Sequence, residues 1–130
     1  MRTIKELGKL EYTTKEMLGY FLMAYKRVKN NKEERLADYI REIMCMLKSI
    51  EKNKILDNIN TSLIADFYFN HLVNCDELMC YGLVVFYRLL NSNKDIKETD
   101  IISQLETEMR LFSARTIIIE AENILNKLQK

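Results

Sequence analysis

His71, Cys75 and Cys80 come nearest in this sequence to a chemical site, because they combine the only histidine with two of the three cysteines. Zinc binds thiolate and imidazole ligands, and residues four apart share one face of a helix. However, Asn74 favours a helix boundary between His71 and Cys75, and the spacing to Cys80 matches no recognised ligand pattern. We therefore predict that the three side chains belong to the core and that the protein binds no metal.

The sequence also lacks the residue combinations that are typical of enzymes. A histidine-activated nucleophile would have to use His71, since no other imidazole is present. Glycine-rich phosphate loops, the H-E-x-x-H pattern and calcium-binding loops do not occur. These observations predict a protein without catalytic residues, enzymatic activity or a cofactor.

Composition and charge narrow the remaining classes of function. The 20 Lys and Arg residues nearly balance the 19 Asp and Glu residues, so a net charge of +1 steers the protein toward neither nucleic acid nor membrane. No apolar run follows Met1–Lys5, so we expect no signal peptide. Three cysteines without a C-x-x-C pair are typical of reduced thiols. We predict a cytoplasmic protein that makes no membrane contact.

One cluster of basic residues supports an alternative function. It spans the predicted end of one helix and the start of the next, and its members are Lys26, Arg27, Lys29, Lys32 and Arg35. Cations stabilise a helix C-terminus in their own right, and Glu33 and Glu34 dilute the positive field. The alternative is a small helical nucleic-acid-binding or accessory protein that uses this basic patch.

The apolar run from Leu78 to Leu90, in which Arg88 is the only charge, predicts a buried central helix over about residues 75–90. A helix that is apolar on every face lies inside a core or a membrane, and this run is shorter than the roughly 20 residues that a membrane span needs. Asn74 and Glu77 have the spacing of a reciprocal N-terminal cap. Gly82 indicates that another helix crosses closely there.

The rest of the chain predicts an all-α fold, a single-domain bundle of five to six helices over residues 1–130. There is no Pro and only three Gly, which argues against a multi-stranded sheet. In the first half we predict a short helix starting near Thr3, a helix from Thr13 to about Val28, and a helix that Asn31 caps with Glu34 and that runs to Ile50. A helix over 63–73 is expected to form a hairpin (62–90) with the central helix. The last segment begins at Asp95 with Glu98 and forms either one helix or two, and a bend near 113–116 is favoured.

The last segment has more apolar residues than one contact face requires. They are Leu111, Phe112, Ile117, Ile118, Ile119, Ile124 and Leu125. A bundle of this size fully surrounds one helix, and the central helix already takes that place, so another chain is expected to cover the excess. We predict a non-enzymatic interaction or regulatory module that self-associates as a homo-oligomer, a dimer, through its C-terminal helix. The alternative is that the N-terminal segment folds over Ile117–Ile119 and leaves nothing exposed.

Overall fold

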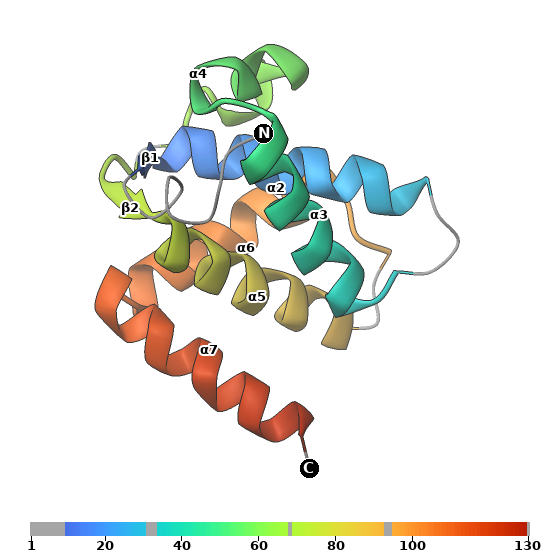
Figure 1. Cartoon of the computed structure of the whole chain (residues 1–130), viewed down its shortest axis with the longest axis vertical. Helices are drawn as coiled ribbons and strands as arrows, with labels where there is room; N and C mark the ends of the chain where they lie inside the picture. The colour runs from blue at the N-terminus through green and yellow to red at the C-terminus, as the bar shows by residue number, and fades with distance from the viewer. Residues whose placement is uncertain (1–9, 31–33, 68, 93–94, 130) are drawn as a thin grey trace.

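The computed structural model is an all-α bundle and describes residues 10–30, 34–67, 69–92 and 95–129 (Figure 1). Its elements are β1 (Glu11–Thr13), α2 (Thr14–Lys29), α3 (Leu36–Ser49), α4 (Lys52–Ile55), the 3-10 turns η1 (Leu56–Asn58) and η2 (Thr61–Ile64), β2 (Leu72–Asn74), α5 (Cys75–Asn91), α6 (Glu98–Leu111) and α7 (Ala114–Leu128). Six α-helices in the described part of the chain confirm the predicted fold class. The short helix predicted near Thr3 lies outside the described residues.

Helix α5 is the buried central helix that the sequence predicts. It packs against α3, α6 and α7, and the stretch from Tyr81 to Phe86 is buried. Gly82 marks the close crossing: a Cβ added there would lie 2.9 Å from Cδ1 of Ile43 and 3.1 Å from Cε1 of Phe21. Among the described residues, no helix has both the length and the apolar character needed to cross a membrane.

Two capping boxes fix the starts of α2 and α5 side by side. The Asn74 side chain accepts a hydrogen bond from the Glu77 backbone N–H, and the Glu77 carboxylate accepts one from the Asn74 N–H, both at 2.8 Å. Thr13 and Glu16 form the equivalent pair at the start of α2, where the sequence predicts a helix to begin. Strands β1 and β2 lead into these two helices and pair antiparallel, with Glu11 opposite Asn74.

The helix predicted over 63–73, and with it the hairpin 62–90, is wrong. The segment instead contains η2, an irregular stretch and strand β2. In β2, Val73 is buried while Leu72 on one side and Asn74 on the other are exposed, which is the alternation of a strand and not of a helix. The extended Asn74 (φ −84°, ψ 177°) caps α5, so a preceding helix cannot run through it.

Two predicted helix starts are also displaced. Helix α3 begins at Leu36, where Arg35 and Asp38 form the cap; Asn31 lies outside the described residues. Helix α6 begins at Glu98, where the Lys97 N–H donates to the Asp100 carboxylate, whereas Asp95 pairs with Lys29 and does not cap the helix. The bend predicted near 113–116 is confirmed as a break between α6 and α7.

Candidate interaction surface

Helix α7 lies at the edge of the bundle and packs mainly against α5 (Figure 1). Ile117, Ala121 and Ile124 recur at helical spacing and are buried. The chain is extended at Phe112, and Ser113 caps α7 by accepting a hydrogen bond from the Thr116 N–H at 3.3 Å. The Tyr81 hydroxyl of α5 donates to the Phe112 carbonyl at 2.9 Å, so the junction between α6 and α7 is fixed to the central helix.

The structure separates the seven predicted interaction residues into three groups. Ile117 and Ile124 are fully buried by their own chain. Phe112 and Ile118 are half-buried. Leu111, Ile119 and Leu125 are exposed, with 67%, 57% and 44% of their surface accessible. One face of α7 therefore completes the core, and the apolar residues beside that face remain open.

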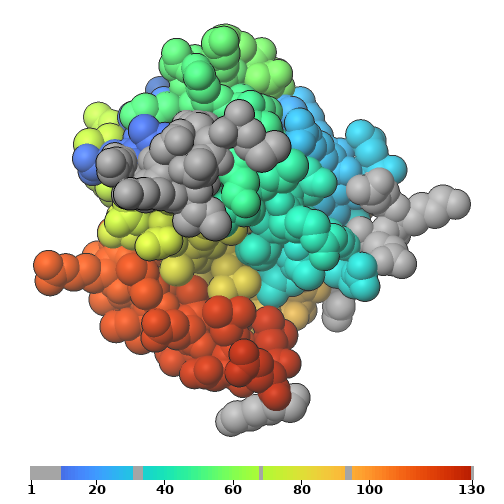
Figure 2. All heavy atoms as spheres, in the orientation of Figure 1, coloured from blue at the N-terminus to red at the C-terminus, as the bar shows by residue number. Residues whose placement is uncertain are grey.

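Ile118 and Leu125 open into an apolar groove of about 290 Å³ between α3, α5 and α7. In Figure 2, atoms of α5 are visible in the space that separates α3 from α7. The groove is lined by Ile40, Met79, Cys80, Leu83, Ile118, Ala121, Glu122 and Leu125. Among the described residues that line the groove, Glu122 carries the only charge, so the groove accommodates apolar side chains with one anionic edge. Sequence reasoning missed the groove because its walls come from three separate helices.

The thiol of Cys80 lies in this groove and stays protonated. Burial raises its pKa to about 11, and the carboxylates of Asp76, Glu122 and Glu77 add to the shift. The same carboxylates make the surroundings of the groove negative. The thiolate is the reactive form of a cysteine, so Cys80 is an unreactive thiol at neutral pH.

We expect alkylation of Cys80 by iodoacetamide at pH 8 to be at least tenfold slower than alkylation of the exposed Cys45. Because a raised thiol pKa delays ionisation, the Cys80 rate should keep rising with pH and level off only near pH 11. Peptide mass spectrometry at a series of pH values measures both rates in one sample. A Cys80 profile that levels off below pH 9 would contradict the described environment.

A polar network on the other side of α7 joins three helices. Arg88 of α5 contacts Glu108 of α6 (Nε to Oε2, 3.2 Å) and Glu120 of α7 (Nη2 to Oε2, 3.7 Å). Glu108 is only 1% exposed and also accepts a hydrogen bond from the Gln104 side chain at 2.6 Å. The single charge of the apolar run thus helps to position α7.

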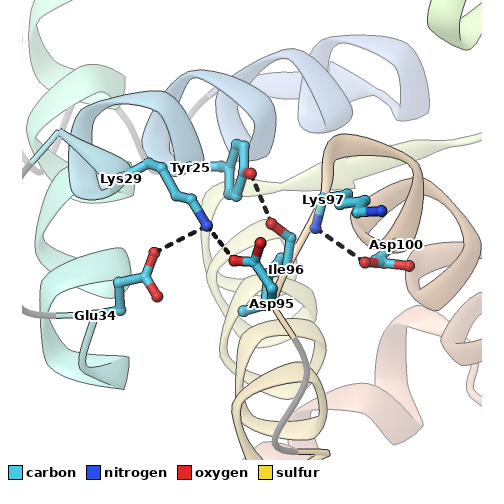
Figure 3. Close-up of polar contacts among 7 residues, drawn as sticks. All are labelled: Tyr25, Lys29, Glu34, Asp95, Ile96, Lys97 and Asp100. Carbon is cyan, nitrogen blue, oxygen red and sulfur yellow. Dashed lines mark hydrogen bonds and ion pairs between the residues drawn. The ribbon is translucent and has the colours of Figure 1, made fainter.

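Carboxylates neutralise much of the predicted basic patch, as Figure 3 shows for its central residue. Lys29 contacts Asp95 at 2.6 Å and Glu34 at 3.5 Å. These contacts raise the pKa of Lys29, chiefly through the hydrogen bond to Asp95, and that bond lowers the pKa of Asp95. Beside Lys29, the Tyr25 hydroxyl donates to the Ile96 carbonyl at 2.6 Å, which fixes the chain that carries Asp95.

The other members of the patch are similarly engaged where the structure describes them. Arg27 lies 3.6 Å from Glu42, and Arg35 pairs with Asp38 of its own cap at 3.4 Å. Lys26 is half-buried. Lys32 lies outside the described residues. Bound carboxylates reduce the charge available to phosphate groups, which weakens the case for nucleic-acid binding.

The histidine and cysteines are not gathered into a metal site. His71 is exposed, so its predicted place in the core is wrong; it precedes the short strand β2, and no helix carries it inward. Cys75 is buried and Cys80 lies in the groove. Within the described residues, no group of three His, Cys, Asp or Glu side chains has an arrangement that could hold a metal ion.

Comparison with known proteins gives no relative for this chain: no family model, no curated protein sequence and no solved structure matches it significantly.

Proposed function

We propose that the protein is a non-enzymatic interaction or regulatory module that self-associates through α7. The observation that carries this proposal is the apolar groove beside α7, into which Ile118 and Leu125 open. Exposed Ile119 and Leu128, at 57% and 54%, extend the apolar surface along the same helix. Contiguous apolar surface with a polar edge is typical of protein–protein contacts. We also propose a cytoplasmic location, supported by three cysteines that form no disulfide within the described chain.

The exposed fractions set the size of the expected effect. Fully burying a Leu or Ile side chain contributes about 1.5–3 kcal/mol, so covering the open half of one side chain contributes about 1 kcal/mol. Each 1.4 kcal/mol changes an equilibrium constant tenfold. Two such contacts therefore account for a change of about 10- to 100-fold in the dissociation constant.

The double variant Ile119→Ser/Leu125→Ser tests the proposal. We expect its dimer dissociation constant to rise by about 10- to 100-fold, because it removes two exposed apolar contacts but leaves the buried face of α7 intact. Sedimentation velocity over a wide range of protein concentration measures the constant. Leu63→Ser/Leu72→Ser is the matched control, since these leucines are 37% and 55% exposed on other elements. A wild-type protein that stays monomeric at high micromolar concentration would overturn self-association.

Nucleic-acid binding through the basic patch is the alternative function. Labelled DNA and RNA titrated at low and moderate salt separate it from the proposal, because phosphate binding weakens steeply with salt. A pure protein-binding module leaves both probes unbound. Salt-sensitive binding that disappears in Lys26→Glu/Arg27→Glu would favour the alternative.

A further inference from the structure

The open face of α7 carries two opposite charges among its apolar residues. Arg115 and Glu122 are both exposed, and about two helical turns separate them. At 3.6 residues per turn they lie about 20° apart around the helix axis, with Ile118 about 40° to one side of Glu122 and Ile119 about 40° to the other side of Arg115. Leu125 continues the face beside Ile118. The face is therefore apolar, with one cation and one anion near its midline.

Both charges lack a partner of opposite sign in the described part of the chain. Glu120 of the same helix pairs with Arg88, whereas no ion pair among the described residues includes Arg115 or Glu122. Glu122 also forms the anionic edge of the groove into which Ile118 opens. Covering this face with an apolar surface alone would bury two unpaired charges, which costs free energy. A second copy of the same face supplies the missing charge for each.

The order of the two charges along α7 determines how a second copy can dock. In a parallel pair in register, each Arg115 lies beside the Arg115 of the other copy and each Glu122 beside the other Glu122, so like charges meet. In an antiparallel pair centred between Ile118 and Ile119, each Arg115 lies level with the Glu122 of the other copy, because both residues are equally far from the centre. A twofold axis through that centre relates the two copies, as in most dimers.

We infer that two copies pair their α7 helices antiparallel, with two contacts between Arg115 and Glu122 around a centre formed by Ile118 and Ile119. The inference rests on the proposed self-association and adds its orientation and its charged contacts. Helix α7 lies at the edge of the bundle, where a second helix has room to approach (Figure 1). In this alignment Leu125 comes level with the junction between α6 and α7 of the second copy, close to Leu111, which is 67% exposed.

Charge reversal tests the two contacts in the full-length protein. We expect the dimer dissociation constant to rise about tenfold in Arg115→Glu and in Glu122→Arg, because each change replaces two attractions with two repulsions. Arg115→Glu/Glu122→Arg restores opposite charges and should return the constant to within about threefold of the wild type. Lys127→Glu is the matched control, since this exposed cation lies about 120° around α7 from Arg115. Sedimentation velocity at one salt concentration measures all four constants.

Spin labels measure the orientation directly. One label is placed by Asn123→Cys or by Lys127→Cys, in a Cys45→Ser background that removes the exposed native thiol. An antiparallel pair separates the two labels along the helix axis by about 13 Å at position 123 and about 25 Å at position 127, whereas a parallel pair in register keeps them level at both. Pulsed electron paramagnetic resonance measures the two distances.

The two experiments separate the inference from the function on which it rests. Label distances that do not grow from position 123 to position 127 would overturn the antiparallel pairing and leave self-association standing. Single reversals that dimerise as tightly as the wild type would do the same, because a parallel pair keeps like charges together in every variant. A wild-type protein that stays monomeric at every concentration would overturn both.

Discussion

Phe86→Ala is expected to lower the free energy of unfolding by about 3–5 kcal/mol. The Phe86 side chain is fully buried at the centre of α5. Its ring stacks on Tyr39 of α3 with 4.2 Å between centroids and meets Phe21 of α2 edge-on at 6.1 Å. Truncation opens a cavity where three helices meet, next to the crossing at Gly82. Urea denaturation followed by circular dichroism measures the loss.

Tyr87→Ala is the matched control, because it removes an aromatic side chain from the next position of the same helix. Tyr87 is only half-buried, so we expect a loss of about 1–2 kcal/mol. Both variants carry the same change in helix propensity, and the difference between them therefore reports burial. Equal losses would show that α5 does not bury the face that the structure describes.

The sequence predicts α5 well because its signals are local. A run that is apolar on every face can only be interior, and the capping residues Asn74 and Glu77 lie three positions apart. Gly82 predicts a close helix crossing for a similar reason, since a residue without Cβ in a helix interior needs a compensating contact. The structure supplies that contact through Ile43 and Phe21.

The helix predicted over 63–73 is wrong because the structure of this segment depends on pairing with β1, which is distant in the sequence. Three residues of β2 are too few for an alternating pattern to be distinguished from one turn of a helix. The strand exists because Val73 pairs with Tyr12, which lies far earlier in the sequence. Leu63 and Phe67 have helical spacing, but the pairing of β2 with β1 places Leu72 in a strand.

The sequence predicts that α7 has surplus apolar residues, but it does not predict which of them are exposed. Counting apolar residues on α7 shows that they exceed one contact face. The structure, and not the sequence, shows that Ile117 and Ile124 are buried and that Ile118 and Leu125 open into a groove. That division depends on how α7 is rotated on α5, which the tertiary packing between these two helices determines and the local sequence does not.

Arg88→Leu is expected to lower the free energy of unfolding by about 3–5 kcal/mol, the usual cost of removing one partner of a buried ion pair. Glu108 is 1% exposed, and Arg88 is the cation that contacts its carboxylate, at 3.2 Å. The hydrogen bond from Gln104 remains in the variant but supplies no charge. Chemical denaturation at neutral pH measures the change. Glu120→Gln should cost no more than about 1 kcal/mol, because its contact with Arg88 is longer and partly exposed.

The double variant Arg88→Leu/Glu108→Leu separates the ion pair from the positioning of α7. It removes both charges together, so no buried carboxylate is left without a cation, and most of the lost stability should return. The buried residues Ile117, Ala121 and Ile124 still hold α7 on α5 in this variant. Its dimer dissociation constant should therefore equal that of the wild type, whereas Ile119→Ser/Leu125→Ser weakens association without unfolding the bundle. An unstable double variant would mean that the network itself determines how α7 packs on α5.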